Sequence, residues 1–160
     1  MRISFDVDDT LVVYDPQTPV EMHVPWWWRW RYSEPLRHGT RALMQALRAR
    51  GHELWIYTTS YRQPGYMRGW FRSFGVPLVE VINQDRHDQV VKKAQFPGYM
   101  PSKYPPAFGI DLHIDDSEGV AMEGREHGFQ VVVVAPNDTD WAARILVAVD
   151  AACGLAQEDR

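Results

Sequence analysis

Short, strongly apolar segments alternate along the chain with stretches whose apolar residues recur at helical spacing. Short apolar segments are typical of buried strands, and amphipathic stretches are typical of helices that pack one face on a sheet. This alternation indicates an α/β fold: a single Rossmann-like, doubly wound parallel sheet of about five strands with helices on both faces. We expect strands at residues 3–5, 54–57, 77–82, 111–114 and 130–135, and helices at about 40–50, 64–74, 117–127 and 137–154.

Two regions do not follow this alternation. Residues 15–36 are rich in proline and tryptophan and show no clean period, so we interpret them as an irregular excursion and call them the flap. Residues 83–110 contain four prolines in their second half, and we expect mostly loop there. The segment at 130–135 is so rich in β-branched residues that both of its faces should be buried.

Composition limits the class of protein. A chain of 160 residues that is 45% hydrophobic is sized for a single domain, which we place at residues 1–160. A net charge of -4 argues against broad electrostatic binding to nucleic acid and leaves only a local basic patch open. The single cysteine, Cys153, cannot form an intrachain disulfide, and no apolar run is long enough to span a bilayer. We therefore expect a cytoplasmic protein with no membrane contact.

Candidate chemistry begins where the first strand ends. Asp6, Asp8 and Asp9 lie within four positions and are followed by Thr10. Open α/β sheets bind ligands beyond the carboxyl ends of their strands, so this loop is the expected place for a site. Neighbouring carboxylates repel one another and raise each other's pKa unless a cation lies among them. A hard divalent ion such as Mg²⁺ would relieve that repulsion.

Two further polar clusters follow predicted strands, Thr58-Thr59-Ser60 and Asp115-Asp116-Ser117, with lysines between them. Together with Asp6-Val7-Asp8-Asp9-Thr10, this ordered set resembles the four motifs of the haloacid dehalogenase (HAD) superfamily. The resemblance covers nearly the whole catalytic domain of that superfamily, and the order of the clusters is far more specific than any one of them.

The resemblance implies an Mg²⁺-dependent phosphohydrolase. Asp6 would be the nucleophile that forms an aspartyl-phosphate, and Asp8 would protonate the leaving oxygen and later activate water. Thr58 and Thr59 would bind the phosphoryl group, while Asp9 and Thr10 would shape the loop. The Mg²⁺ ligands would be the carboxylates of Asp6, Asp115 and Asp116 and the backbone carbonyl of Asp8.

The motif lysine is not settled by spacing. Lys92, Lys93 and Lys103 all lie between the second and last clusters. We favour Lys103 as a phosphate-binding residue, because it stands close before the fourth strand. We expect the other two to be ordinary solvated lysines, and His113, inside that strand, to be a satisfied core histidine rather than a ligand.

Neither gap between the clusters is long enough for a full cap domain, so the match is to the capless members of the superfamily. The flap contains Trp26-Trp27-Trp28-Arg29-Trp30. It could act as a substitute cap, with Trp27 and Trp28 stacking on the leaving group and Arg29 near the phosphate. The alternative is that these rings pack on the domain or on a twin subunit, forming a homodimer.

Three functions remain in competition. The leading one is a phosphomonoesterase acting on a phosphorylated substrate of unknown class. The second is a phospho-acceptor receiver domain, which also gathers Asp, Thr and Lys at strand ends but in another chain order. The third is a non-enzymatic binding module in which the acidic site is vestigial and the flap contacts a partner.

Overall fold

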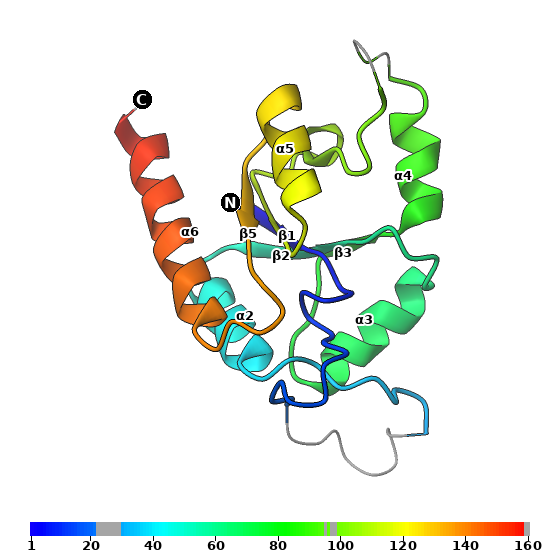
Figure 1. Ribbon diagram of the computed structural model, residues 1–160, viewed down its shortest axis with the longest axis vertical. Coiled ribbons are helices and arrows are strands. Elements are labelled where there is room, and N and C mark those ends of the chain that lie inside the picture. Colours follow the sequence, from blue (N-terminus) through cyan, green and yellow to red (C-terminus); the bar gives the residue numbers. More distant parts are fainter. Residues whose placement is uncertain (22–29, 95, 97–98, 159–160) are drawn as a thin grey trace.

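The protein is described by a computed structural model covering residues 1–21, 30–94, 96 and 99–158 (Figure 1). Its centre is a sheet whose strands are all parallel and follow the order β3-β2-β1-β4-β5. The strands are β1 (Arg2–Phe5), β2 (Glu53–Tyr57), β3 (Glu80–Ile82), β4 (Leu112–Asp115) and β5 (Val131–Val133). The predicted class, a doubly wound α/β fold, is confirmed.

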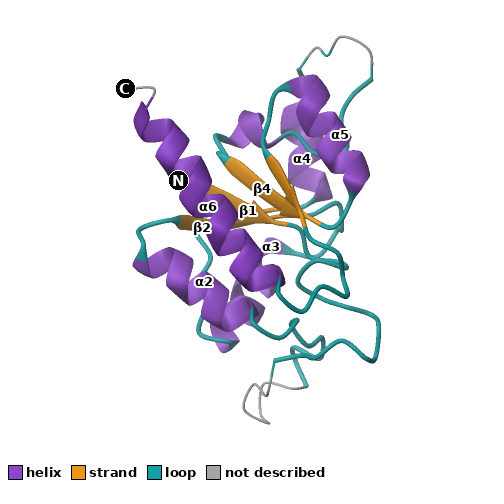
Figure 2. Ribbon diagram, turned by 60° about the vertical axis from the view of Figure 1, so that its left-hand side comes forward, coloured by secondary structure: helices purple, strands orange, loops and turns teal. Residues whose placement is uncertain are grey.

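Helices cover both faces of this sheet. Figures 1 and 2 show α2, α3 and α6 on one face and α4 and α5 on the other. The helices are α2 (Thr40–Ala49), α3 (Pro64–Ser73), α4 (Gln84–Val91), α5 (Glu118–His127) and α6 (Trp141–Glu158), with a short 3-10 helix η1 at Pro105–Phe108. In the described part of the chain these elements form no separate cap domain, and none of the helices is long and apolar enough to cross a membrane.

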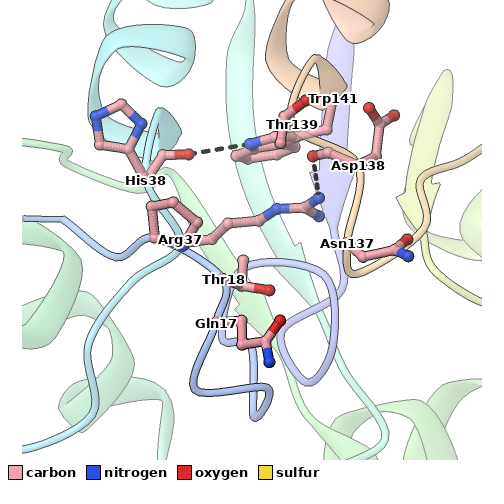
Figure 3. A pocket seen from close by; sticks show the side chains of 9 residues that line it. Gln17, Thr18, Arg37, His38, Asn137, Asp138, Thr139 and Trp141 are labelled. Atoms are coloured by element: carbon pink, nitrogen blue, oxygen red, sulfur yellow. Dashed lines mark hydrogen bonds between the residues drawn. The ribbon is translucent and has the colours of Figure 1, made fainter.

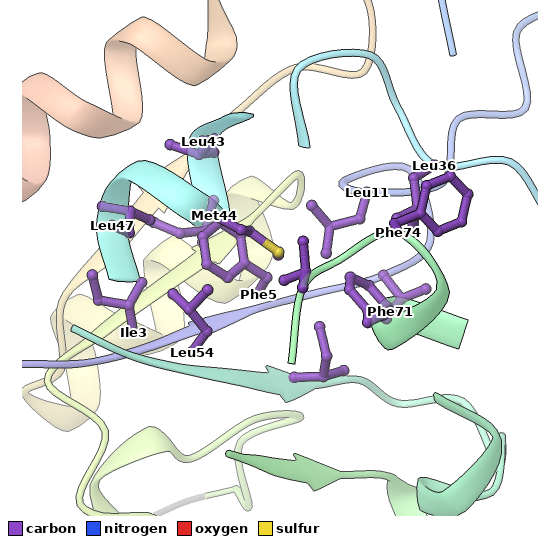
Figure 4. Packing of buried hydrophobic residues seen from close by; sticks show 14 of the residues in the cluster. Ile3, Phe5, Leu11, Leu36, Leu43, Met44, Leu47, Leu54, Phe71 and Phe74 are labelled. Carbon is purple, nitrogen blue, oxygen red and sulfur yellow. The ribbon is translucent and has the colours of Figure 1, made fainter. Parts of the chain in front are cut away.

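The main core lies between the sheet and α2, α3 and α6. Met44 and Leu47 of α2 lie toward the sheet near Ile3 and Phe5, as Figure 4 shows, and Leu43 belongs to the same buried cluster. All five side chains are buried. The spacing of the three α2 residues is that of one helix face, and β1 is buried because it lies at the centre of the sheet. The core thus fixes the strand from which the first acidic loop leaves.

The strand order reverses between β1 and β4. The chain moves from β1 to β2 and β3 on one side, then crosses to β4 on the other side of β1. Ligands of open α/β sheets bind at such a switch point, beyond the carboxyl ends of the strands. Asp6 directly follows β1 and Asp115 ends β4, so the topology brings them to this crevice. The order also contradicts the receiver alternative, because receiver domains have the order 2-1-3-4-5.

Several predicted elements need correction. The region 83–110 is not mostly loop, because α4 and η1 lie within it. Asn83 caps α4 by accepting a hydrogen bond from the Arg86 backbone, and all the prolines of the region come after this helix. β3 is shorter than predicted, and α6 begins at Trp141 rather than near residue 137. β5 is an edge strand with partly exposed residues, so the prediction that both its faces are buried was wrong.

The flap is closed at its base. Val20 and Arg37 form an antiparallel bridge, and the Glu21 backbone N–H donates to the Leu36 carbonyl at 2.7 Å. The two ends of the flap are therefore held side by side next to the sheet. Trp27, Trp28 and Arg29, on which the substitute-cap and dimer predictions rest, lie outside the described residues.

Candidate active site

Lys103 joins two carboxylates at the switch point. Its Nζ donates to Asp6 Oδ1 and to Asp115 Oδ2, each at 2.5 Å. All three side chains are buried, with 8% or less of each exposed. Buried charges persist when they are paired in this way, and the ammonium has donors for both partners. We call Asp6, Lys103 and Asp115 the Lys103 cluster.

The base of this cluster is extended by His113 and Ser4. Asp115 can only accept hydrogen bonds, so His113 Nε2 donates to it at 2.9 Å. The other ring nitrogen, Nδ1, then accepts from the Ser4 hydroxyl at 2.7 Å. Ser4 and His113 are partners in the register of β1 and β4, so the sheet itself aligns them. His113 is the satisfied core histidine that the sequence predicts, and it orients Asp115.

The two carboxyls of the Lys103 cluster differ in acidity. Burial raises the pKa of Asp6 to about 7, and the charge of Asp115 adds to this against the attraction of Lys103. Burial also opposes ionisation of Asp115, but the hydrogen bond from His113 and the charge of Lys103 hold its pKa below its usual range. Burial lowers the pKa of Lys103, but the two carboxylates outweigh it, so the net shift is upward. Asp115 therefore carries the firmer negative charge, because it has more hydrogen-bond donors around it.

The loop after β1 turns sharply back on itself. Asp9 has a φ of 59°, in the left-handed region that aspartate tolerates better than most residues. The Leu11 and Val12 backbone N–H groups both donate to the Val7 carbonyl, which closes the turn. The Thr10 hydroxyl donates to Asp116 at 3.3 Å and so ties this loop to the end of β4.

Thr58 lies at the carboxyl end of β2, next to β1. It is buried, and its hydroxyl oxygen accepts the Ser60 backbone N–H at 3.1 Å, which leaves the hydroxyl proton available to donate. Thr59 is exposed. Thr58 is thus placed as a fixed donor at the same sheet edge as the Lys103 cluster, whereas Thr59 is not.

The other two candidate lysines lie elsewhere. Lys92 and Lys93 are both exposed, and Lys92 pairs with Asp88 one turn earlier along the chain. The structure therefore places Lys103, and neither of these two, at the acidic groups.

Asp8 has partners that the sequence analysis missed. Its two carboxylate oxygens accept from Arg62 Nη2 and Nη1 at 2.9 and 2.7 Å, and the Tyr14 hydroxyl donates to it at 2.5 Å. Arg62 also contacts Glu34 at the end of the flap. Burial opposes ionisation of Asp8, but these donors hold its pKa below the usual range. A basic residue four positions after Thr58 was visible in the sequence, but its partners were not.

The carboxylates at the switch point are the candidate ligands of a metal ion. Among the described residues, no three His, Cys, Asp or Glu side chains converge closely enough to form a metal site on their own. Burial and the neighbouring Asp115 charge nevertheless raise the pKa of Asp116, so negative charge at this edge is incompletely neutralised. Mg²⁺ usually takes only one or two protein carboxylates and completes its shell with water and phosphate oxygens. The donors present fit that habit.

A separate cavity of about 300 Å³ lies between the base of the flap and the segment that follows β5. Figure 3 shows Arg37 crossing it over the Trp141 ring, with its guanidinium donating to the Asp138 carbonyl. Trp141 Nε1 donates to the His38 carbonyl. No residue of the Lys103 cluster lines this cavity. We therefore interpret it as a gap between the flap's base and the start of α6, and not as part of the active site.

Solved structures place this arrangement in a known fold. The HAD domain of the effector protein Lem4 from Legionella pneumophila superposes with a TM-score of 0.55 over 99% of this chain and 96% of its own, at 13% identity. A HAD-superfamily hydrolase of subfamily IA from Geobacter sulfurreducens gives a TM-score of 0.55 at 14% identity, covering 92% of this chain and 98% of its own. The chain has the HAD fold.

A third similar structure is a chain of a Pnkp1/Rnl/Hen1 complex, with a TM-score of 0.53 and 12% identity. The match covers 86% of this chain but only 46% of that longer one, so this chain spans about half of its length. No family model matches the sequence, and no curated protein matches it either. At these identities the likeness concerns the fold alone.

Proposed function

We propose that the protein is a phosphomonoesterase that works through an aspartyl-phosphate on Asp6. The observation that carries this proposal is the buried bridge of Lys103 between Asp6 and Asp115 at the switch point of a HAD fold. A fixed ammonium beside a carboxylate nucleophile suits the transfer of a phosphoryl group, whose oxygens carry negative charge. The Thr58 hydroxyl, at the end of the neighbouring strand β2, would also donate to the phosphoryl oxygens.

The chemistry runs in two steps. In the first, which begins with Asp8 protonated, an Asp6 oxygen attacks phosphorus, the bond from phosphorus to the leaving oxygen breaks, and Asp8 gives that oxygen its proton. Asp8 is then the carboxylate that Arg62 and Tyr14 stabilise. In the second, water attacks the aspartyl-phosphate, Asp8 takes the proton of the water, and inorganic phosphate leaves Asp6 free. Lys103 and Thr58 hold the other phosphoryl oxygens in both steps.

We propose Mg²⁺ as the cofactor. Asp6, Asp115 and the backbone carbonyl of Asp8 would hold it directly, with water and phosphate oxygens completing its shell and Asp116 adding negative charge beside it. When bound, the ion would supply positive charge to phosphate oxygens and neutralise the acidic groups that Lys103 leaves uncompensated.

The test is hydrolysis of a panel of phosphate monoesters, with Mg²⁺ and with a chelator, by the wild type and by Asp6→Asn. We expect Mg²⁺-dependent turnover in the wild type and loss of turnover in the variant, with an unchanged circular dichroism spectrum. Asp85→Asn, an exposed carboxylate of α4, is the matched control and should keep full activity. Acid quenching during turnover should trap phosphate on a peptide containing Asp6. If the wild type is active and Asp6→Asn keeps its rate, the covalent mechanism is excluded.

A further inference from the structure

The Arg62 guanidinium joins the carboxylates of Asp8 and Glu34. Nη1 and Nη2 donate to the two Asp8 oxygens at 2.7 and 2.9 Å, and Nη2 and Nε donate to the two Glu34 oxygens at 2.6 and 3.3 Å. The planar guanidinium thus makes two hydrogen bonds to each of the two carboxylates. A lysine ammonium has no such fork and cannot reproduce it.

The backbone on both sides of this contact is anchored. Asn83, a buried residue that caps α4, donates from its side chain to the Arg62 carbonyl at 3.3 Å. Trp70, a fully buried residue of α3, donates from Nε1 to the Glu34 carbonyl at 3.1 Å. Arg62 therefore approaches Asp8 from a fixed support, and Glu34 braces it from the flap's base.

Asp8 needs this support because little else restrains its side chain. It lies on the loop after β1, and 37% of its side chain is exposed. Its only other side-chain partner among the described residues is Tyr14, which is itself 60% exposed. A group that exchanges a proton with a reacting oxygen must stay within hydrogen-bond distance of it, and small misplacements cost much of the rate.

We propose that Arg62 is a positioning residue: it holds the Asp8 carboxylate in the orientation that serves the leaving oxygen, and Glu34 holds Arg62 in turn. This inference rests on the proposed phosphomonoesterase function. It assigns a role to two residues outside the HAD-like motifs, and it couples the flap's base to the step in which the ester bond breaks.

The chemistry of the leaving group separates this role from others. An alkyl phosphate such as glycerol phosphate needs a proton on its leaving oxygen, whereas para-nitrophenyl phosphate releases a stable anion and needs that proton much less. Loss of Asp8 positioning must therefore slow the alkyl ester far more than the aryl ester. Loss of a direct contact to the transferred phosphoryl group would slow both esters alike.

The experiment measures kcat and KM for both esters with the wild type, Arg62→Ala, Arg62→Lys, Glu34→Gln and Asp8→Asn. We expect Arg62→Ala to lower kcat for glycerol phosphate about 10-fold or more while the aryl ester loses much less. Arg62→Lys should fail nearly as badly because it lacks the fork, and Glu34→Gln should show a smaller loss of the same pattern. The double variant Asp8→Asn/Arg62→Ala should be no worse than Asp8→Asn alone, because the two residues act as a unit.

Arg68→Ala is the matched control. Arg68 pairs with Glu80 in an exposed contact and should behave like wild type on both esters. Equal losses on the two esters, additive losses in the double variant, or faster turnover of glycerol phosphate by Arg62→Ala would each overturn the inference while leaving the phosphomonoesterase function standing. Absence of turnover in the wild type would instead overturn the proposed function, and the inference with it.

Discussion

Lys103 donates a 2.5 Å hydrogen bond to Asp6 although 97 positions separate the two residues in the chain. The same ammonium reaches Asp115, so a single cation balances two buried carboxylates. Removing one member of a buried ion pair leaves a charge without compensation, which costs far more than losing a surface pair. The stability of the sheet's carboxyl edge therefore depends on Lys103.

Replacing Lys103 with methionine keeps much of the side chain's volume but removes its charge. We expect Lys103→Met to lower the free energy of unfolding by about 3–5 kcal/mol at pH 8, because Asp6 and Asp115 then lie buried without their cation. Urea denaturation of the metal-free protein measures this change. Lys92→Met, which breaks only an exposed pair, is the control and should unfold at nearly the wild-type urea concentration. Equal midpoints for the two variants would contradict the prediction.

The raised pKa of Asp6 predicts a pH-dependent effect of Asp6→Asn on stability. An unfolded aspartate ionises at about 4, whereas burial raises the pKa of folded Asp6 to about 7. Between these values the folded protein holds a proton that the unfolded chain has released. Asp6 therefore destabilises the wild type increasingly as pH rises through this window, and the penalty is complete above the folded pKa.

Asparagine does not titrate, so the melting temperature of Asp6→Asn minus that of the wild type should grow from pH 4 to 7 and then level off. A shift of one pKa unit corresponds to about 1.4 kcal/mol. We therefore expect this difference in melting temperature to increase by about 5 °C or more between pH 4 and pH 7 for a chain of this length. Thermal scans in chelator at a series of pH values test this. A difference that does not change with pH would show that Asp6 is ionised equally in the folded and unfolded protein.

Mg²⁺ binding should depend on Asp115. We expect Asp115→Ala to weaken Mg²⁺ binding at least about 10-fold, because it removes the carboxylate whose charge His113 and Lys103 keep in place. Calorimetric titration with Mg²⁺ alone measures this without any substrate. Asp85→Ala, on the exposed side of α4, should bind like wild type. If the isotherm of Asp115→Ala matches that of the wild type, Mg²⁺ does not bind at Asp115.

Position 69 of α3 has room only for glycine, because Tyr32 of the flap packs against the helix there. A Cβ at this position would overlap the Tyr32 hydroxyl, which lies directly against the helix. Glycine within a helix normally costs about 1 kcal/mol relative to alanine, so Gly69→Ala would stabilise an isolated helix. We expect the opposite here, with a lower melting temperature. The double variant Gly69→Ala/Tyr32→Phe should recover part of the loss, and stabilisation by Gly69→Ala alone would contradict the packing.

The role of the flap tryptophans, as a lid or as a dimer interface, remains a prediction that experiment can test. We expect the double change Trp27→Ala and Trp28→Ala either to raise KM for a natural, bulky substrate or to disrupt a dimer, with little effect on a minimal aryl phosphate. Steady-state kinetics and light scattering check the two outcomes. A double variant that matches wild type in both would exclude the segment as lid and as interface.

The sequence predicted most elements because their signals are local. β1 and β2 are short apolar runs, and α2, α3 and α5 show helical spacing and are followed within two positions by a glycine. The missed helix α4 lacked an apolar stripe of that kind, since only His87 and Val91 are buried on it. The burial of β5 was overestimated because composition cannot tell an edge strand from a central one. Position in the sheet is a property of the folded chain.

The sequence by itself determined the order of the polar clusters and the strand ends that carry them, because each cluster follows an apolar run within a few residues. Only the tertiary structure decided which of them meet. Of three candidate lysines, the loop before β4 brings Lys103 to Asp6, and the register of β1 and β4 aligns Ser4 with His113. The contact of Arg62 with Asp8 and Glu34 depends on supports from α3 and α4. Such contacts join residues far apart in the chain, and no local pattern encodes a distance between them.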